Sequence, residues 1–590
     1  MSIPHRTHYA GELRAEHIGK TVVVNGWIDS HRDLGSLLFF DVRDRAGKVQ
    51  CIIEPTSETM YLYEEGKKLR SEFVVRIEGA LRKRSNPNNK ISTGEIEIVV
   101  TFIVVLNESD VPPFVVEEEV RANEDLRLKY RYLDLRRPSL QKNLMMRHRI
   151  TKSIRDHFDS RGFIEIETPM LMKATPEGAR DFLVPSRLHP GEFYALPQSP
   201  QIYKQILMVA GLDKYFQIVK CFRDEDLRAD RQPEFTQLDV EMSFPDEEMI
   251  YDVMENCLRK VWTDVGLELP AFPRYTYKDV MERFGSDKPD LRYELEITTL
   301  TEMLRGKTEF KVFTDVLQKK QGRIAAVVVP NGAAWSRKQI DELTEVAKTY
   351  GAGGIVWVKK TAEGIDSSAK KFLTPELHTE IADTCKMNVG DMALIACHEK
   401  WSRACTILGA LRIEIAKRLE LTKGKSNVFA PLWVLNFPMF EFDEESGNYN
   451  AMHHPFTSPV VEDWNARTDD LTVIRARAYD IVVNGYELGS GSIRIHNRTL
   501  QTEVFDMLGL SKEEQEKKFG FMLDAFRFGA PPHGGMALGI DRISMICAGT
   551  DNIRDVIAFP KTTSMQGLME ECPSTIDPKQ LAELKIVIGK

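Results

Sequence analysis

The chain has 590 residues, of which 42% are hydrophobic and 28% are charged, and its net charge is −9. This length exceeds one hydrophobic core, so roughly two to four domains are expected in a soluble, cytoplasmic globular protein. The sequence contains no apolar run of the ~20 residues that a membrane helix needs, no secretory signal, and no Cys-x-x-Cys pair among its eight cysteines, which argues against a zinc site.

The first part of the chain has the alternation and the β-branched content of strands. Strands are expected at 21–29, 36–44, 48–54, 73–84 and 94–106, with a helix at 57–70. Five strands with a helix after the third is the order of an OB-fold barrel, which often binds single-stranded nucleic acid. Phe39 and Phe40 are neighbours on one strand, so one is expected in the barrel core and the other on its surface.

The rest of the chain reads as a larger α/β region with an insert. A pair of prolines near residue 112 indicates a hinge, and a basic helical stretch is expected over Leu126–Arg149. The segment 290–425 has strand and helix patterns of its own. It lacks the arginines and carboxylates embedded in apolar strands that occur on either side of it. The expected divisions are 1–107, 108–140, 141–289, 290–425 and 426–590.

Two short strings resemble functional motifs but are better explained otherwise, and one common motif is absent. The glycines of GAGGIV (351–356) lead into a strand, so they indicate a helix end and a turn and not a dinucleotide loop. His453 and His454 are adjacent, and adjacent side chains rarely converge on one metal ion. The sequence has no Walker A motif, so ATP, if it is a substrate, is bound in another way.

The segment 221–242 combines charged side chains with β-strand patterns. It predicts a strand, a charged loop and a second strand, with Arg223 and Glu225 near the strand ends and Asp239 inside the second strand. A solvated hairpin tip explains the charges of 226–231 but not these three residues, because buried charges are costly unless they are paired or used.

Two later segments share this property. In 475–497, Asp480 and Glu487 on adjacent strands suit Mg²⁺ bound to phosphates, although cross-strand ion pairs with Arg475 or Arg477 are an alternative. Glycines at 485, 489 and 491 are interpreted as room for a ligand. In 534–549, Asp541 and Arg542 lie at a strand–helix junction, where the arginine can face an anion and the aspartate can cap the helix.

Taken together these segments resemble a known family. GFIEIETPML (162–171), FRDED…RQPEFTQLD (222–239) and GGMALGIDR (534–542) are similar to motifs 1, 2 and 3 of class II aminoacyl-tRNA synthetases. TPEGARDF, QSPQIYKQ, FGSDKPDLR, AMHHPFTSP and GSGSIRIH are similar to the bacterial aspartyl-tRNA synthetases of subclass IIb, which also carry an insert at 290–425. The resemblance covers essentially the whole chain.

The resemblance implies an α+β multidomain protein. Residues 1–107 are expected to form a five-stranded OB-fold anticodon-binding barrel, and 108–140 a hinge. The two parts of an antiparallel-sheet catalytic domain are expected at 141–289 and 426–590, around an inserted α/β domain. Such an enzyme activates aspartate with ATP to form aspartyl-adenylate and pyrophosphate, and then transfers the aspartate to tRNA(Asp). Mg²⁺ is the implied metal and a homodimer the implied assembly, with Pro169 at the interface. Whether tRNA(Asn) is also charged stays open.

The resemblance also assigns residues. The catalytic residues are Arg223, Glu487 and Arg542. The aspartate-binding residues are Glu177, Gln201, Lys204, Arg223, Asp239, His453 and Arg494. The ATP-binding residues are Arg223, Asp224, Glu225, Gln232, Glu487, Gly539, Ile540, Asp541 and Arg542. Mg²⁺ is assigned to Asp480 and Glu487, and the anticodon to Arg32, Phe39, Gln50 and Arg82.

Three alternatives are weaker on the residues present. An asparaginyl or lysyl enzyme is disfavoured because Lys204 and Arg494 suit a carboxylate substrate. A catalytically silent RNA-binding or regulatory protein would be expected to have lost ATP-site residues such as Arg223 and Arg542, which are present. A tRNA-independent asparagine synthetase would not need the N-terminal barrel.

Overall fold

A computed structural model describes residues 5–174, 178–226 and 230–589. The chain divides into two compact units, Met1–Arg147 with Asn552–Ile576, and His148–Asp551 with Asp577–Lys590. None of the helices in the described part of the chain combines the length and the apolar character needed to cross a membrane.

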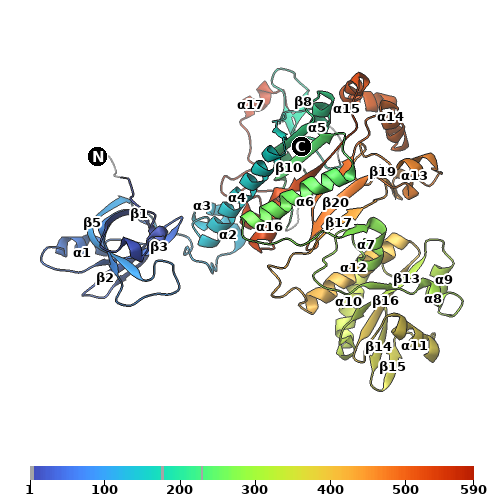
Figure 1. Ribbon diagram of the computed structural model, residues 1–590, viewed down its shortest axis with the longest axis horizontal. Helices are drawn as coiled ribbons and strands as arrows, with labels where there is room; N and C mark the ends of the chain where they lie inside the picture. Colours follow the sequence, from blue (N-terminus) through green and yellow to red (C-terminus); the bar gives the residue numbers. More distant parts are fainter. Residues whose placement is uncertain (1–4, 175–177, 227–229, 590) are drawn as a thin grey trace. The chain divides into compact units, whose positions relative to one another are not determined.

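The first unit contains a closed barrel of five strands in the order β1-β2-β3-β5-β4 (Figure 1). Its elements are β1 (Thr21–Asp33), β2 (Leu38–Asp44), β3 (Gly47–Ile53), α1 (Met60–Lys67), β4 (Val74–Lys83) and β5 (Ile96–Asn107). The OB-fold prediction is therefore confirmed, with its helix after the third strand. Phe40 is buried in the barrel core and Phe39 is half-buried on the outer face, as the strand alternation requires.

The basic helical stretch is three helices where the sequence predicted one. These are α2 (Glu124–Lys129), α3 (Arg131–Asp134) and α4 (Pro138–Ser160). Proline is favoured in the first turn of a helix and disfavours the helical conformation in the residue before it, which explains the break before Pro138. Buried Arg131 donates hydrogen bonds to the carbonyl oxygens of Arg554, Ile557 and Ala558, so the distant segment Asn552–Ile576 packs in this unit.

The second unit is built on an eight-stranded sheet in the order β11-β17-β20-β21-β22-β10-β9-β6. The strands are β6 (Ile164–Glu165), β9 (Lys214–Phe222), β10 (Glu234–Ser243), β11 (Arg274–Thr276), β17 (Pro431–Leu435), β20 (Ala478–Val483), β21 (Tyr486–Ile493) and β22 (His533–Gly539). All neighbours are antiparallel except the edge pairs β11–β17 and β6–β9. The prediction of a largely antiparallel sheet in this region is confirmed.

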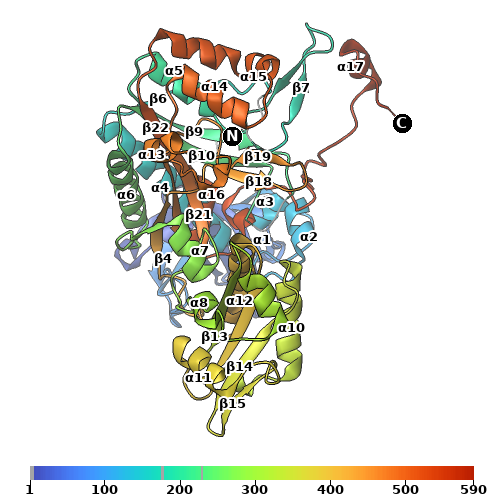
Figure 2. The same ribbon diagram turned by 90° about the vertical axis from the view of Figure 1, so that its right-hand side faces the viewer.

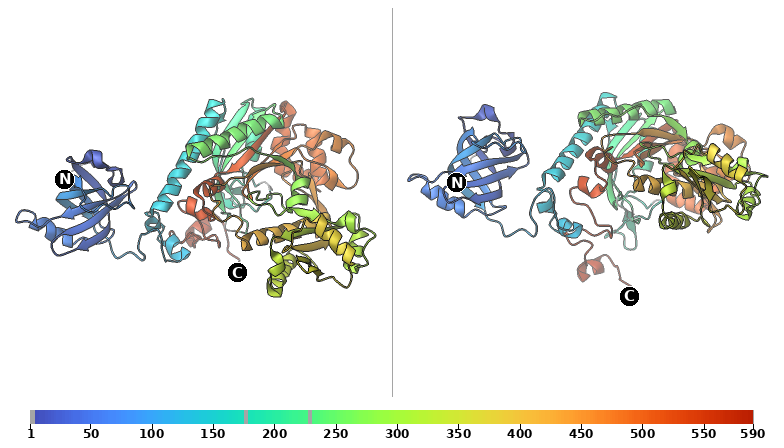
Figure 3. Two further views of the ribbon diagram at one scale, coloured as in Figure 1. Left: turned by 60° about the horizontal axis from the view of Figure 1, so that its bottom comes forward. Right: turned by 90° about the horizontal axis from the view of Figure 1, so that it is seen from below.

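Further helices and two short hairpins outside the sheet belong to the same unit. The helices are α5 (Gln201–Val209), α6 (Glu247–Asp264), α7 (Tyr277–Phe284), α13 (Val461–Asn465), α14 (Arg498–Met507), α15 (Lys512–Ala525), α16 (Ile540–Ala548) and α17 (Pro578–Glu583). Two short hairpins are β7 (Leu183–Pro185) with β8 (Phe193–Ala195), and β18 (Phe440–Asp443) with β19 (Asn448–Ala451). Helix α6, drawn in green, runs along one face of the sheet (Figure 3).

Strand β10 shows why the two faces of the sheet differ. Leu238, Val240 and Met242 are buried on one face, where Met242 lies beside Val253 of α6. The intervening Gln237, Asp239 and Glu241 therefore point to the opposite face. One amide and two carboxylate side chains of β10 therefore lie on this second face of the sheet.

The segment predicted as an insert has its own five-stranded antiparallel sheet in the order β12-β13-β16-β14-β15. Its elements are β12 (Ile297–Thr299), α8 (Thr301–Leu304), α9 (Lys311–Leu317), β13 (Arg323–Val329), α10 (Arg337–Thr349), β14 (Val356–Thr361), β15 (Gly364–Ser367), α11 (Pro375–Thr384), β16 (Met392–His398) and α12 (Trp401–Arg418). Alternate residues of β13 and β16 pack against α10 and α12 on one face and α8, α9 and α11 on the other (Figure 2). The GAGGIV glycines join α10 to β14, as predicted.

Buried His157 on α4 predicts a pH dependence of stability. Its Nε2 lies 3.1 Å from the carbonyl oxygen of Val253, and burial, with the charge of Arg161, lowers the pKa of His157. Below pH about 6.5 the unfolded histidine gains a proton that the folded one resists, so stability falls as the pH falls and is unaffected above that pH. Thermal unfolding at pH 5.5 and 7.5 should show a smaller acid loss for His157→Gln than for the unchanged protein. An equal loss would contradict the assignment.

Candidate active site

The segments that resemble motifs 2 and 3 lie side by side in the sheet. Strand β10 pairs with β9 on one side and β22 on the other, with Asp239 opposite Gln217 and Ala537. The Oδ2 of Asp541 accepts a hydrogen bond of 2.8 Å from the backbone N–H of Thr236. Asp541 thus ties α16 to β10, while the N-cap position of α16 belongs to Gly539.

Arg542 connects three segments that are far apart in the sequence. Its Nη1 donates to the carbonyl oxygen of Glu487 at 2.7 Å, and its Nη2 donates to Oδ2 of Asp230 at 3.2 Å. The guanidinium therefore lies where the charged loop, the β20–β21 hairpin and the start of α16 meet. Residues Gly539 and Ile540 form the same strand–helix junction.

The other predicted ATP residues border the charged loop. The guanidinium carbon of Arg223, just after the end of β9, lies 5.0 Å from the ring centroid of Phe235, a cation–π contact. Asp224 forms an ion pair of 2.9 Å with Arg180, and Glu225 lies 3.5 Å from Arg231. Gln232 is buried at the start of the returning strand.

A cluster of buried polar side chains, called the polar pocket below, lies beneath α5. Gln201, Lys204 and Gln205 have the i, i+3, i+4 spacing of one helix face, and all three are buried against the sheet. Lys204 Nζ lies 3.1 Å from Oδ1 of Asp239 and 3.4 Å from Oε2 of Glu241. Gln201 donates to Gln205, which bonds to His533.

Arg494 enters the same pocket from the end of β21. Its Nε and Nη2 donate to the two carboxylate oxygens of Glu241 at 3.0 and 3.2 Å. Its Nη1 lies 2.6 Å from both Ser492 Oγ and His454 Nε2. The predicted Lys204–Arg494 pair thus converges on one glutamate, which is 0% exposed.

Glu241 and His454 were not among the predicted site residues. The signal for Glu241 is its place in the alternation of Gln237 and Asp239 along β10. His454 was weighed only as half of a metal-binding pair, and its partner Arg494 is 40 residues away.

The two carboxylates of the pocket have opposite pKa shifts. Burial raises the pKa of Asp239, and Lys204 offsets only part of this. Burial also opposes ionisation of Glu241, but Arg494 and Lys204 outweigh it and lower the pKa of Glu241. Two cations, Lys204 and Arg494, thus stand beside two carboxylates, of which Glu241 is the one whose ionised form its neighbours stabilise.

Two buried polar atoms in this region lack a hydrogen-bond partner within the described residues. Asp239 Oδ2 and His453 Nε2 have no hydrogen-bond partner among the residues that the structure describes. His453 bonds to Ser490 Oγ through Nδ1 at 3.0 Å, and burial lowers the pKa of His453 to about 4. An orphaned buried polar atom is costly, so these two atoms are candidates for contact with a bound polar group.

The acidic pair of the β20–β21 hairpin does not form the alternative ion pairs. Arg475 pairs with Asp463 and Arg477 with Glu247. Asp480 is buried, its Oδ1 is without a partner within the described residues, and burial, then the charge of Glu487, raises the pKa of Asp480. Two close carboxylates with an orphaned oxygen fit a divalent cation.

The interpretation of the nearby glycines as room for a ligand is wrong. Gly485 has φ +85° and forms the hairpin turn after Asn484. A Cβ on Gly489 or Gly491 would lie 2.0 or 2.4 Å from backbone oxygens of β22. These two glycines accommodate the neighbouring strand, and a side chain there would separate β21 from β22.

The predicted anticodon residues share one face of the barrel in the first unit. Gln50 Oε1 accepts from Arg32 at 3.5 Å, and Gln50 Nε2 donates to Glu97 at 2.7 Å. Arg82 donates to Glu97 at 2.9 Å, and Phe39 lies opposite Arg32 in the β1–β2 ladder. Glu97, which was not predicted, joins Gln50 to Arg82.

One predicted aspartate-binding residue, Glu177, lies outside the described residues. The structure describes all the others, and Gln201, Lys204, Asp239, His453 and Arg494 come from α5, β10, the loop after β19 and the end of β21.

Comparison with known proteins gives consistent results. The family described as "tRNA synthetases class II (D, K and N)" matches residues 123–563, and "OB-fold nucleic acid binding domain" matches 22–106. The aspartate–tRNA(Asp/Asn) ligase of Caldanaerobacter subterraneus subsp. tengcongensis is 51% identical over 588 residues, covering 99% of this chain and 98% of that protein. The aspartate–tRNA ligase of Macrococcus caseolyticus is 48% identical over 591 residues, covering 99% and 98%.

Solved structures show the same fold at lower identity. The asparaginyl-tRNA synthetase of Pyrococcus horikoshii, complexed with asparaginyl-adenylate, has a TM-score of 0.58 and 18% identity over 94% of this chain and 98% of its own. The aspartyl-tRNA synthetase of Entamoeba histolytica has a TM-score of 0.58 and 19% identity over 92% and 89%. The chain therefore belongs to the class II tRNA synthetases of the D, K and N group, within the family of aspartate–tRNA ligases.

Proposed function

We propose that this protein is an aspartate–tRNA ligase, which forms aspartyl-adenylate and pyrophosphate from aspartate and ATP and then transfers aspartate to the terminal adenosine of tRNA(Asp). The observation that carries the proposal is the convergence of Lys204 and Arg494 on Glu241, beside the strands of motifs 2 and 3. This reaction requires that the substrates be positioned and that developing charge be stabilised, and it does not require a nucleophile from the protein.

Lys204 and Arg494 would bind the side-chain carboxylate of aspartate. Both groups only donate hydrogen bonds, so an amide nitrogen in place of a carboxylate oxygen would face donors without an acceptor. The orphaned Oδ2 of Asp239 would accept from the α-ammonium group. Gln201, and Glu177 and His453 by resemblance, complete the proposed aspartate site.

ATP would lie across the segments that Arg542 connects. Arg223 would hold the α-phosphate and the aspartate α-carboxylate, and Arg542 the γ-phosphate, since both guanidinium groups border the charged loop. Asp224, Glu225, Gln232, Gly539, Ile540 and Asp541 would form the walls of the ATP site. The site would hold the α-carboxylate of aspartate next to the α-phosphate of ATP, in the orientation that attack requires.

Asp480 and Glu487 would hold Mg²⁺ together with the phosphates. When bound, the ion would neutralise phosphate charge and orient the triphosphate. The described residues contain no group of three or more metal-ligating side chains, so ATP would supply the remaining ligands.

Asp480→Asn is expected to raise the Mg²⁺ concentration for half-maximal pyrophosphate exchange by about tenfold or more, because an amide oxygen is a weaker ligand than a carboxylate. Titration of exchange with Mg²⁺ checks this. An unchanged midpoint would place the ion elsewhere.

The barrel would bind the anticodon of the tRNA. Phe39→Ala is expected to raise KM for tRNA about 10-fold, because stacking of one base on an aromatic ring is worth about 1–3 kcal/mol. Pyrophosphate exchange without tRNA should be unchanged. Loss of both activities would show that Phe39 has a structural role, and Phe102→Ala, an exposed aromatic on β5, is the matched control.

Charging assays with tRNA(Asp) and tRNA(Asn) would define the tRNA range. Aspartylation of tRNA(Asp) alone indicates a discriminating enzyme, and aspartylation of both indicates a non-discriminating one. We place the enzyme in the cytoplasm, where charged tRNA is used.

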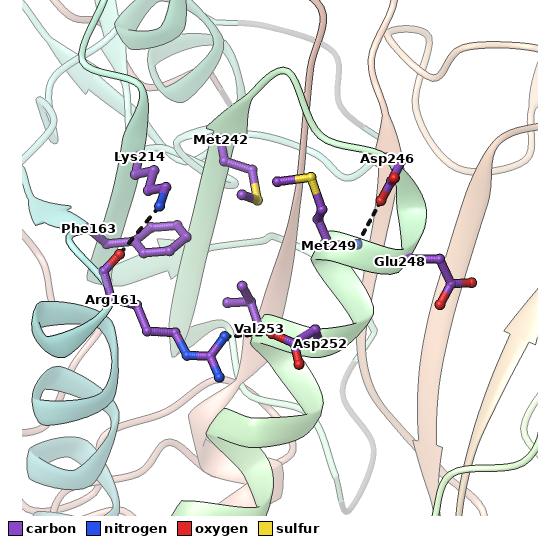
Figure 4. A pocket seen from close by; sticks show the side chains of 9 residues that line it. All are labelled: Arg161, Phe163, Lys214, Met242, Asp246, Glu248, Met249, Asp252 and Val253. Atoms are coloured by element: carbon purple, nitrogen blue, oxygen red, sulfur yellow. Dashed lines mark hydrogen bonds and ion pairs between the residues drawn. The ribbon is translucent and has the colours of Figure 1, made fainter.

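A homodimer would form through the motif 1 region. Ile164, Leu171 and Phe244 expose half or more of their surface (50%, 52% and 67%), and Pro169 is also exposed. Phe163, which precedes Ile164, lines a pocket of about 590 Å³ in which Met242 and Met249 form an apolar wall among charged side chains (Figure 4). Exposed apolar residues around a hollow are typical of a protein interface. Sedimentation of Ile164→Glu should show monomer where the unchanged protein shows dimer.

A further inference from the structure

The insert is joined to the eight-stranded sheet by two connections. The outgoing connection (residues 285–296) runs from the end of α7 to β12, and the returning connection (residues 419–430) runs from the end of α12 to β17. Helix α12 lies beside α7 in both views (Figures 1 and 2). Their backbones touch, because a Cβ on Gly285 would overlap the carbonyl oxygen of Cys405, and one on Gly409 would overlap that of Gly285. The insert is therefore fixed to the start of the outgoing connection.

Arg412 of α12 binds the outgoing connection with a buried guanidinium group. The residue is 1% exposed, and the guanidinium carbon lies 4.3 Å from the ring centroid of Tyr293. It donates hydrogen bonds to the backbone carbonyl oxygens of Asp290 (2.8 Å), Tyr293 (3.1 Å), Glu294 (3.0 Å) and Leu295 (3.2 Å). Residues 285–296 belong to no helix or strand, so contacts of this kind fix their conformation.

The outgoing connection packs against the turn of the β20–β21 hairpin. Gly485 lies in this turn with φ +85°, and a Cβ on it would lie 3.3 Å from the Cβ of Asp290. Burial first, then the charge of Glu487 and then that of Asp287, raise the pKa of Asp480. A residue of the outgoing connection is therefore close enough to act on a carboxylate of the hairpin.

The returning connection binds the same turn. Asn484 Oδ1 accepts a hydrogen bond from the backbone N–H of Ala430 at 2.8 Å, and its Nδ2 donates to the carbonyl oxygen of Val428 at 3.0 Å. Lys425 donates to the carbonyl oxygen of Arg292 at 2.7 Å, which ties the two connections to each other. The turn is thus held by both connections of the insert.

The strand ladder of the hairpin is interrupted between its two carboxylates. Ile481 pairs with Gly489, but Val482 pairs with Glu487, so β21 has one extra residue at this point. A bulge bends and twists a strand locally, and close carboxylates repel each other. The spacing of Asp480 and Glu487 therefore depends on contacts from outside the ladder, and the turn is where those contacts are made.

We propose that Arg412 is a positioning residue for adenylate formation, which holds the outgoing connection against the β20–β21 hairpin and so sets the spacing of Asp480 and Glu487. The insert then supports the ATP site without contacting the substrates. The inference rests on the proposed function, because it takes these two carboxylates as the Mg²⁺ ligands. Groups that orient metal ligands contribute to metal affinity without touching the metal.

The test is equilibrium binding of ATP to full-length Arg412→Gln without aspartate or tRNA, in Mg²⁺ and, separately, in EDTA. We expect the Kd of ATP in Mg²⁺ to rise about 3- to 10-fold and the Kd in EDTA to stay unchanged, because only the contribution of the metal depends on the spacing of the carboxylates. The Mg²⁺ midpoint of pyrophosphate exchange should rise by the same factor, with KM for aspartate unchanged. A general loss of folding would instead weaken ATP binding under both conditions.

The matched control is Arg418→Gln. Arg418 lies on the same helix and pairs with Glu342 and Glu414 within the insert. Its loss should leave both Kd values unchanged. Arg412→Lys, which keeps the charge and three donors, should recover part of the affinity that Arg412→Gln loses.

A second variant keeps the test valid if Arg412→Gln does not fold. Asn484→Gly removes the two hydrogen bonds to the returning connection, and glycine accepts the φ of +54° at this position. It should also raise the Kd of ATP in Mg²⁺ alone. An unchanged Kd in the folded variants, or an equal rise in Mg²⁺ and EDTA, would overturn the inference. Absence of pyrophosphate exchange by the unchanged protein with aspartate would instead refute the proposed function.

Discussion

Arg494→Gln is expected to lower kcat/KM for aspartate in pyrophosphate exchange by about 10³-fold. Arg494 is 2% exposed and forms a bidentate ion pair with Glu241, while its third nitrogen lies between Ser492 and His454. Glutamine would leave the buried charge of Glu241 to Lys204 alone, and the Glu241 carboxylate would then repel an incoming carboxylate. The loss should therefore appear as a raised KM for aspartate, with KM for ATP little changed.

The matched control is Arg477→Gln. Arg477 also forms a bidentate ion pair with a glutamate, Glu247, at 2.7 and 2.8 Å, but in a contact outside the pocket. Its loss is expected to lower thermal stability and to leave the kinetics with aspartate unchanged. Equal kinetic losses in the two variants would show that Arg494 acts only by stabilising the fold.

Arg223→Gln is expected to lower kcat of exchange by about 10²- to 10³-fold, because it removes a positive charge from the position where negative charge develops during attack on the α-phosphate. The ring of Phe235 at 5.0 Å would remain to pack against the shortened side chain, so the fold should be preserved. Loss in kcat, with smaller changes in KM for either substrate, separates this role from ground-state binding.

Arg274→Gln provides the comparison for this second prediction. Arg274 lies over the ring of Tyr251 at 4.7 Å, a similar arrangement of guanidinium and aromatic ring at the far edge of the sheet. Single-turnover measurement of adenylate formation should be unaffected in this variant. A rate for Arg223→Gln within threefold of the unchanged protein, a factor of about 0.6 kcal/mol, would remove Arg223 from the mechanism.

The sequence was sufficient to predict the barrel. Strand alternation predicted that one of Phe39 and Phe40 faces outward, and the charged residues inside apolar strands singled out Asp239 and Asp480, both of which are buried in the structure. These inferences depend on local periodicity and on the cost of burying charge, which can be assessed from neighbours along the chain.

What the sequence did not provide depends on contacts between distant segments. Glu241 and His454 meet Arg494 across 253 and 40 residues, so nothing local distinguishes them from ordinary strand and loop residues. Gly489 and Gly491 were assigned to a ligand because sequence alone does not tell a close ligand from a close neighbouring strand. The helix predicted over Leu126–Arg149 divides at Tyr130 and before Pro138, where proline chemistry outweighs the helical pattern.

The most direct test of the proposed function is ATP–pyrophosphate exchange by the purified protein without tRNA, with aspartate, asparagine and lysine offered separately. The pocket of Lys204, Arg494 and Glu241 predicts exchange with aspartate and none above background with the other two. Exchange driven by asparagine or lysine, or no exchange with any of the three by folded protein, would contradict the account.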